Sequence, residues 1–365
     1  MSMPAPRTML LALALPLAAC GSSTTPATQT TDAATAADTA APTDTGSTTA
    51  TDTGTPLDTG TVTPADAGGP TDAGPVDEFG NPPVVVPSCD ALAAGTVNGF
   101  TVDSIDRQFI LTLPRGATAP SGHWPVVFNW HGLGDTAANM NGLLAGAVNN
   151  ASMPFILVTP ESTHLLPTTS PIGIEWDNIR TRQDSRDARF FDAVLQCLDS
   201  RWGVDRDRVY TVGFSAGAIM SDLLGVLRGS QIAAVVSFSG GYFSDPMNPP
   251  TLGPLSTYPQ WPALAPSARY SQLVVYGGTA DMFSLAIAAA HFNQFAANDI
   301  PYLNTARHDV VACGHGGGHT IPTGVQATQI VEFLAAHPRT VTSSPWASAL
   351  PADYPSYCSF HAQAM

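Results

Sequence analysis

The fold is decided by the stretch Arg208-Val209-Tyr210-Thr211-Val212-Gly213-Phe214-Ser215-Ala216-Gly217. An apolar run leads into Gly-x-Ser-x-Gly, and apolar residues at helical spacing follow it: Ile219, Met220, Leu223, Leu224 and Leu227. This pentapeptide exposes a nucleophilic serine when it forms a sharp turn between a buried strand and a helix. The turn strains the serine backbone, and the two outer glycines let helix and strand pass closely. The stretch therefore predicts a strand, a turn and a helix, with Ser215 as the nucleophile.

Short apolar runs alternate with helical patterns on both sides of that stretch. The expected strands are Arg107–Leu113, Val126–Trp130, Phe155–Thr159, Arg208–Gly213, Ala233–Ser239 and Gln272–Gly277. One helical face between them consists of Phe190, Phe191, Val194, Leu195, Leu198 and Trp202. Continuous apolar strands are typical of a sheet that is covered on both faces. The alternation predicts an α/β fold, with a mainly parallel central sheet and helices on both faces, in one domain over residues 81–365.

Residues 1–20 have the pattern of an export signal. A short basic start precedes an apolar run, Met9–Leu17, that is shorter than the ~20 residues of a membrane-spanning helix. Leu17-Ala18-Ala19-Cys20 resembles a bacterial lipobox, which implies cleavage before Cys20 and a lipid on that residue. Residues 21–80 consist mainly of Thr, Ala, Asp, Gly, Pro and Ser, so we expect a disordered linker. The prediction is an exported cell-envelope lipoprotein, at the outer membrane or cell surface or released, whose membrane contact is the lipid at Cys20.

The charge balance excludes two classes of partner. The net charge is −15, whereas nucleic-acid binding and docking on anionic lipid both require clustered basic groups. Hydrophobic residues make up 44 % of the chain, which is enough for a sizeable core. We therefore expect a globular protein whose partners are neither nucleic acid nor anionic lipid surfaces.

The acid and base that activate such a serine follow it along the chain in the order serine, acid, histidine. The buried run Gln272-Leu273-Val274-Val275-Tyr276 leads into Gly277-Gly278-Thr279-Ala280-Asp281. Asp281 thus lies just past the carboxyl end of a strand, where such folds collect catalytic groups. Asp281 is the expected acid, and Asp245 and Asp309 are the alternatives.

The expected base is His319, in Cys313-Gly314-His315-Gly316-Gly317-Gly318-His319-Thr320. Glycines let this loop bend so that one imidazole can reach Ser215. His315 is the rival for this role. The two histidines are not read as a metal site, because no third ligand lies nearby, and neither a metal nor a cofactor is expected.

An oxyanion hole needs backbone N–H groups that point at the developing negative charge. One donor is expected to be the amide of Ala216, directly after the nucleophile. The second is expected in the loop His131-Gly132-Leu133-Gly134-Asp135, which follows a buried strand. Leu133 is the first candidate there and Gly132 the next, whereas His131 is read as a residue that shapes the loop. A second serine motif, Ser237-Phe238-Ser239-Gly240-Gly241, is read as a simple strand-to-loop turn, because no periodic helix follows it.

The chain contains five cysteines. If Cys20 carries lipid, then Cys89, Cys197, Cys313 and Cys358 remain, an even number in an exported protein. Two disulfides are therefore expected, and the sequence leaves all three possible pairings open.

Four motifs together resemble the polyhydroxybutyrate depolymerase and feruloyl esterase group of α/β-hydrolases. They are His131-Gly132-Leu133-Gly134, Gly213-Phe214-Ser215-Ala216-Gly217, Gly278-Thr279-Ala280-Asp281 and Gly317-Gly318-His319-Thr320-Ile321-Pro322. The resemblance covers roughly residues 98–334 and implies the α/β-hydrolase fold, with Asp281 as the acid and His319 rather than His315 as the base. It also implies that Gly173-Ile174-Glu175-Trp176-Asp177 lines the acyl pocket, where Trp176 would either clamp an acyl group or pack in the core.

The resulting prediction is a serine esterase that hydrolyses carboxylic esters through an acyl-Ser215 intermediate. Candidate substrates are feruloyl or acetyl esters of plant polysaccharide and hydroxyalkanoate polyester. No polymer-binding module accompanies the motifs, which favours soluble esters over insoluble polymer. The alternatives are a serine peptidase of the same fold and a surface-binding protein that has lost catalysis.

Overall fold

The computed structural model describes residues 82–86, 88–163, 176–178, 185–245, 247, 261–285 and 288–364. The expected signal at residues 1–20, its lipid site Cys20 and the expected linker at residues 21–80 lie outside this part of the chain. Within the described ranges, no helix combines the length and the apolar character that crossing a membrane requires.

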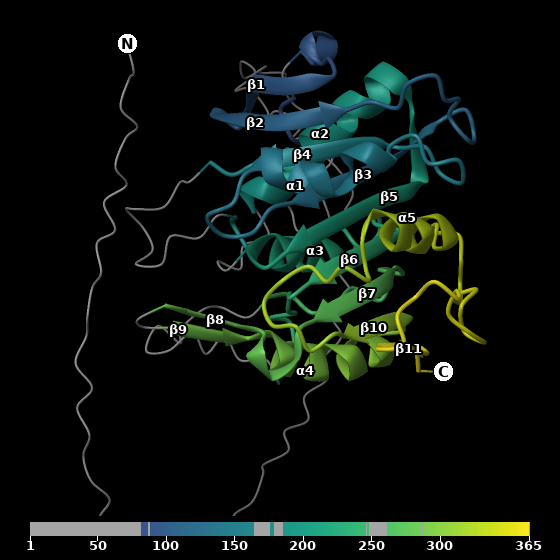
Figure 1. Cartoon of the computed structure of the whole chain (residues 1–365). Coiled ribbons are helices and arrows are strands. Elements are labelled where there is room, and N and C mark those ends of the chain that lie inside the picture. The colour runs from purple at the N-terminus through teal and green to yellow at the C-terminus, as the bar shows by residue number, and fades with distance from the viewer. Residues whose placement is uncertain are drawn as a thin grey trace, which may run out of the picture. The chain divides into compact units, whose positions relative to one another are not determined.

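A nine-stranded sheet runs through the described residues in the order β1-β2-β4-β3-β5-β6-β7-β10-β11 (Figure 1). Its strands are β1 (Gly95–Val102), β2 (Ile105–Thr112), β3 (Trp124–Trp130), β4 (Ile156–Glu161), β5 (Val204–Phe214), β6 (Ala234–Phe238), β7 (Ser271–Tyr276), β10 (Val310–Gly314) and β11 (Cys358–His361). The central strands β4, β3, β5, β6, β7 and β10 are parallel, while β1, β2 and β11 pair antiparallel at the two edges. The predicted mainly parallel sheet is confirmed.

Helices cover both faces of the sheet, as predicted. They are α1 (Ala137–Leu144), α2 (Arg186–Trp202), α3 (Ala216–Leu227), α4 (Phe292–Thr305) and α5 (Ala327–Ala336), with short 3₁₀ turns η1 (Cys89–Ala91), η2 (Ala145–Ala147) and η4 (Gly278–Ala280). Alternate residues of β3 show why two layers are needed: Val126 and Phe128 pack with α2, α3 and α4, whereas Val127 packs in a second cluster with α1 and α5. A two-stranded ribbon, β8 (Met282–Leu285) and β9 (Ala288–His291), follows η4.

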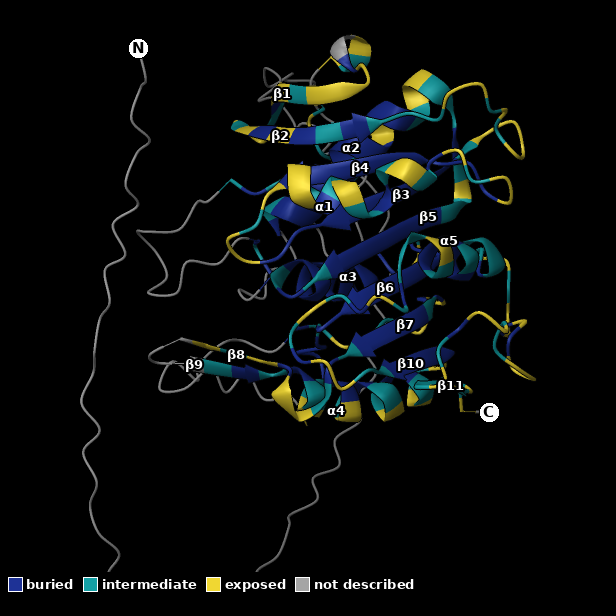
Figure 2. Cartoon of the chain, viewed as in Figure 1, coloured by how far each residue is buried: buried dark blue, intermediate teal, exposed yellow. Residues whose placement is uncertain are grey.

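Apart from the start of β5 at residues 205–208, the parallel strands are buried along almost their whole length, as Figure 2 shows by their dark blue colour. Strands covered on both faces carry side chains inward in both directions, so a continuous apolar run suits them. Because the central strands are parallel, their carboxyl ends meet at one edge. The segments after β3, β5, β6, β7 and β10 therefore assemble there.

Two disulfides join the four cysteines of the described region. Cys89 of η1 is bonded to Cys197 of α2, and Cys313 of β10 is bonded to Cys358 of β11. The second pair lies directly opposite in the antiparallel register of β10 and β11. The expectation of two disulfides is thereby met, and the pairing left open by the sequence is resolved.

Candidate active site

Ser215 lies at the turn between β5 and α3 with φ 54° and ψ −119°, and its residue surface is 7 % exposed. This backbone conformation is rare for a residue with a side chain. A Cβ on Gly213 would lie 2.1 Å from the Gly217 carbonyl oxygen, and one on Gly217 would lie 2.1 Å from the Trp130 carbonyl oxygen. Only glycine fits at these two positions, which explains the spacing of the pentapeptide.

Three side chains from different segments meet at this turn. The Ser215 Oγ lies 2.9 Å from Nε2 of His319, and Nδ1 of His319 lies 2.8 Å from Oδ1 of Asp281. An ionised carboxylate only accepts hydrogen bonds, so Nδ1 carries the proton and Nε2 is free to accept the serine proton. The structure thus brings the expected nucleophile, base and acid together in the order that proton transfer requires.

The carboxylate of Asp281 is fully buried and has a second set of donors. Its Oδ2 accepts hydrogen bonds from the Ser239 hydroxyl at 2.8 Å and from the Gly277 amide at 2.7 Å. Ser239, which the sequence analysis treated as part of a plain turn, therefore fixes the Asp281 carboxylate. The signal that was available is its place just after β6, the strand beside β7.

A buried carboxyl behind the site holds the turn that carries Ser239. Asp222 of α3 accepts hydrogen bonds from the Ser237 hydroxyl and the Gly241 backbone N–H, which flank that turn. It also accepts one from the side-chain amide of Gln272, and all three distances are 2.8–3.0 Å. Burial raises the pKa of Asp222 to about 7, although these donors act in the opposite direction. The donors stabilise a carboxylate that burial disfavours, so the turn is fixed at both ends.

The imidazole of His319 lies between two aromatic rings. The Phe292 ring stacks on it at a centroid distance of 4.8 Å and an angle of 12°, and the Phe214 ring lies 4.9 Å away at 32°. Phe292 is 2 % exposed, and its amide donates to the Asp281 carbonyl oxygen at 3.0 Å. The rings restrict the imidazole, and aromatic faces favour a cation when the ring becomes protonated.

The alternative acids and base have other partners. Asp309 accepts from the Ser344 and Gln363 amides, and Asp245 accepts from the Met247 amide. His315 accepts from the Gly317 amide at Nδ1, and burial lowers its pKa. None of these contacts leads to Ser215 or His319, so the geometry favours Asp281 and His319.

The loop after β3 lies beside Ser215. A Cβ on Gly132 would lie 3.5 Å from the Ser215 Cβ, and the Leu133 residue is 36 % exposed. Ala216 begins α3, so its amide is among those that helix hydrogen bonds leave free. The two expected oxyanion segments are thus both adjacent to Ser215.

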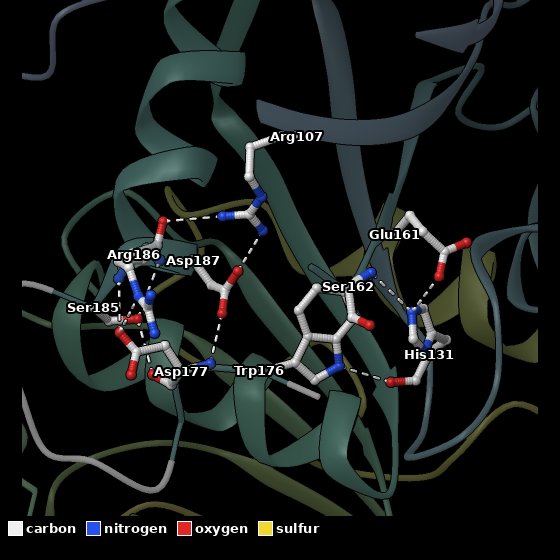
Figure 3. Close-up of polar contacts among 10 residues, drawn as sticks. Arg107, His131, Glu161, Ser162, Trp176, Asp177, Ser185, Arg186 and Asp187 are labelled. Carbon is white, nitrogen blue, oxygen red and sulfur yellow. Dashed lines mark hydrogen bonds and ion pairs between the residues drawn. The ribbon is translucent and has the colours of Figure 1, made fainter. Parts of the chain in front are cut away.

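Trp176 does not lie where the acyl-pocket interpretation placed it. Its residue surface is 1 % exposed, and its ring packs edge-on against Trp130 at 4.9 Å. Its indole N–H donates to the carbonyl oxygen of His131 at 2.8 Å (Figure 3). Trp176 therefore packs in the core behind the loop that follows β3, which is the second of its two expected roles. The neighbouring residues 173–175 lie outside the described part of the chain.

Comparison with known proteins gives related sequences over part of the chain. A family described as phospholipase/carboxylesterase matches residues 119–252. A probable feruloyl esterase C of Aspergillus terreus is 27 % identical over 140 residues, which is 38 % of this chain and 48 % of that protein. Feruloyl esterase D of Neurospora crassa is 28 % identical over 158 residues, 40 % of this chain and 51 % of that protein. The chain spans about half the length of these curated relatives.

Solved structures with the same fold cover more of the chain. The crystal structure of sOPH superposes with a TM-score of 0.56 at 18 % identity, over 76 % of this chain and 96 % of that one. The crystal structure of pOPH gives 0.55 at 17 % identity, over 77 % and 97 %. At this identity the likeness concerns the fold, and in this chain the Ser215 turn lies at the carboxyl edge of the sheet.

Proposed function

We propose that the chain, which has the α/β-hydrolase fold and is similar in part to feruloyl esterases, hydrolyses carboxylic esters through an acyl-Ser215 intermediate. The observation that carries the proposal is the hydrogen-bonded sequence from Ser215 through His319 to the buried carboxylate of Asp281. A serine hydroxyl is a weak nucleophile until a base accepts its proton, and this arrangement supplies that base.

The first half of the reaction transfers the acyl group to the enzyme. The Ser215 oxygen attacks the ester carbonyl while His319 Nε2 takes the hydroxyl proton, and the carbonyl becomes a tetrahedral oxyanion. The amides of Ala216 and Leu133, with Gly132 as the other candidate, donate to that oxyanion. The intermediate collapses, the bond to the alkoxy oxygen breaks, and His319 returns the proton to the leaving alcohol.

The second half releases the acid. A water molecule attacks the acyl-serine carbonyl as His319 accepts one of its protons, and a second oxyanion forms at the same amides. When it collapses, the proton passes to Ser215 and the carboxylic acid leaves. Asp281 stays ionised and holds the imidazolium in both halves, while Ser239 and Gly277 hold Asp281.

The proposed substrates are feruloyl or acetyl esters of plant polysaccharide, or hydroxyalkanoate polyester. The names of the two fungal relatives support the feruloyl esters. The proposed location is the cell envelope, reached by a signal at residues 1–20, with a lipid on Cys20 and a linker over residues 21–80. Two disulfides support an oxidising compartment.

The test is hydrolysis across a panel of p-nitrophenyl esters of increasing chain length, methyl ferulate, a hydroxybutyrate oligomer and a peptide amide. Turnover of one ester class and labelling by a fluorophosphonate probe, both absent in Ser215→Ala, are the expected results. Cleavage of the amide in preference to every ester would instead identify a peptidase. A folded chain that neither turns over an ester nor takes the label would refute the proposal.

A further inference from the structure

Two consecutive peptide groups of the oxyanion loop are held from behind by ring N–H donors. The indole N–H of Trp176 donates to the His131 carbonyl oxygen at 2.8 Å. The ring of His131 lies 2.9 Å from the Gly132 carbonyl oxygen through Nδ1, and because a carbonyl only accepts, Nδ1 is the donor. The two carbonyls belong to the peptides whose N–H groups are those of Gly132 and Leu133, the candidate oxyanion donors.

The His131 ring is itself fixed in that tautomer. Its other nitrogen, Nε2, accepts a hydrogen bond from the Ser162 amide at 3.2 Å, which leaves Nδ1 to carry the proton. The ring is fully buried. His131 therefore has no freedom to turn its Nδ1–H away from the loop.

Trp176 is in turn fastened to the start of α2. The Asp177 amide donates to Asp187 at 2.6 Å, and the Asp177 carboxylate accepts from the Arg186 amide at 3.0 Å. The Ser185 hydroxyl donates to the Asp177 carbonyl at 3.0 Å. Negative groups at a helix N-terminus are stabilised by the helix dipole, so both carboxylates suit their positions.

Arg107 of β2 completes this attachment. It forms a buried ion pair with Asp187, and Figure 3 shows the contacts running from Arg107 through Asp187 and the Asp177 amide to Trp176 and on to His131. The indole is thus held rigidly at one end and bonded to the loop at the other. Such fixed support is what an oxyanion hole needs, because its donors must be in place before charge develops.

We propose that Trp176 is a positioning residue for the oxyanion hole. In a trans peptide the C=O and N–H groups point in opposite directions, and the His131–Gly132 peptide is trans. By fixing the His131 carbonyl, the indole N–H fixes the direction of the Gly132 N–H beside Ser215 and the start of the segment that carries Leu133. A hydrogen bond to a carbonyl also strengthens donation by the N–H of the same peptide. The inference rests on the proposed esterase function.

The test replaces the indole N–H and leaves the shape of the ring. Benzothienylalanine, in which sulfur replaces the N–H, is introduced at position 176 of the full chain, and Trp176→Phe is the second variant. The matched control is benzothienylalanine at position 130, because the Trp130 indole also donates one buried hydrogen bond, to Thr211 at 3.0 Å, away from the loop. Ester turnover is measured with the affinity of a trifluoromethyl ketone, which forms an oxyanion on the serine.

At position 176 we expect kcat to fall about tenfold with KM unchanged, and the affinity for the trifluoromethyl ketone to fall by the same factor. The control at position 130 should leave both within about twofold. Wild-type kcat and inhibitor affinity in the position 176 variants would overturn the inference. A rise in KM alone would overturn it too, because it would assign Trp176 to acyl binding. Absence of turnover in the wild-type chain would instead refute the esterase proposal, so the two failures are distinct.

Discussion

Two of the serine–histidine hydrogen bonds in the described residues differ in what surrounds them. At one, Ser215 lies 2.9 Å from His319, whose side chain is 20 % exposed and whose other nitrogen meets the Asp281 carboxylate. At the other, Ser344 lies 2.7 Å from His337, whose other nitrogen meets the Phe333 carbonyl oxygen. His337 and Ser344 are 1 % and 4 % exposed.

The comparison teaches that a serine and a histidine in contact do not make a nucleophile. A proton taken from serine leaves an imidazolium, and a carboxylate stabilises that cation far better than a neutral carbonyl does. Burial lowers the pKa of His337 to about 4, so that ring resists the proton that a base must accept. The hydrogen bond between Ser344 and His337 attaches the segment that follows α5 to the end of that helix.

The largest difference between the two pairs should appear when the serine of each pair is removed in turn. Ser215→Ala should reduce ester turnover by about 10⁴–10⁶-fold, because the nucleophile is lost. Ser344→Ala should leave kcat and KM within about twofold and lower the melting temperature, because a buried hydrogen bond is lost. Kinetics and thermal unfolding of both variants check this. A large loss of turnover in folded Ser344→Ala would break the comparison.

The next largest effect should come from Asp281, the carboxylate beside His319, where His337 has only the Phe333 carbonyl oxygen. Asp281→Asn should lower kcat by about 10³–10⁴-fold with little change in fold, because an amide no longer enforces the Nδ1–H tautomer of His319. Asp309→Asn is the control, since Asp309 accepts from two backbone amides near His337. Steady-state kinetics at fixed pH should show a loss only in the first variant. Equal losses in both would contradict the assignment of Asp281.

His337 of the second pair, together with the buried His308, should affect the stability of the protein and not the rate of hydrolysis. The pKa of His337 and that of His308 are lowered by burial from 6.5 to about 4, so between these pH values the unfolded chain binds more protons than the folded one. Stability from these groups is complete above pH ~6.5 and is lost as pH falls towards 4, by at most about 3 kcal/mol each. Asp222, raised to about 7, contributes in the opposite direction.

Urea unfolding at several pH values measures this linkage. His337→Gln should flatten the dependence of the unfolding free energy on pH between about 6.5 and 4, although its stability at pH 7 falls because the His337 packing is lost. A slope identical to that of the wild-type chain would show that His337 does not stay neutral in the folded protein.

The smallest effect should come from removing the Ser239 hydroxyl, which donates a hydrogen bond to the Asp281 carboxylate. Ser239→Ala removes one donor to Asp281 and should lower kcat/KM by about three- to tenfold, the value of one hydrogen bond to a charged group. Ser221→Ala is the control, because this buried serine of α3 loses only its bond to Thr211. Equal kcat/KM in the two variants would remove Ser239 from the site.

The nucleophile turn could be predicted from sequence because its constraints are local. Gly213 and Gly217 are dictated by contacts within the turn and with β3, and the pattern of apolar residues identifies β5 and α3. The acid and base were predicted by chain order and a glycine-rich loop, and the structure brings them within hydrogen-bond distance of one another. The fold class followed from the alternation of apolar strands and helical faces.

Other features depend on neighbours that a single sequence does not reveal. The place of Ser239 just after β6 was the only sign of its role, because its hydrogen bond to Asp281 joins two separate segments and appears only in the folded chain. Two roles were left open for Trp176, an acyl clamp and core packing, and only the folded chain shows the buried acceptor of its N–H. The short edge strand β11 has no apolar run, so neither it nor the Cys313–Cys358 pairing could be predicted.

That edge strand also bears on how the molecule behaves at high concentration. Without β11, the apolar strand β10 would present a row of unpaired backbone groups, which is a template for joining another copy. β11 has only four residues, and the Cys313–Cys358 bond fastens it in register. We therefore expect a mild reductant to start edge-to-edge aggregation, seen as rising light scattering, while the nucleophile turn of each molecule is still intact.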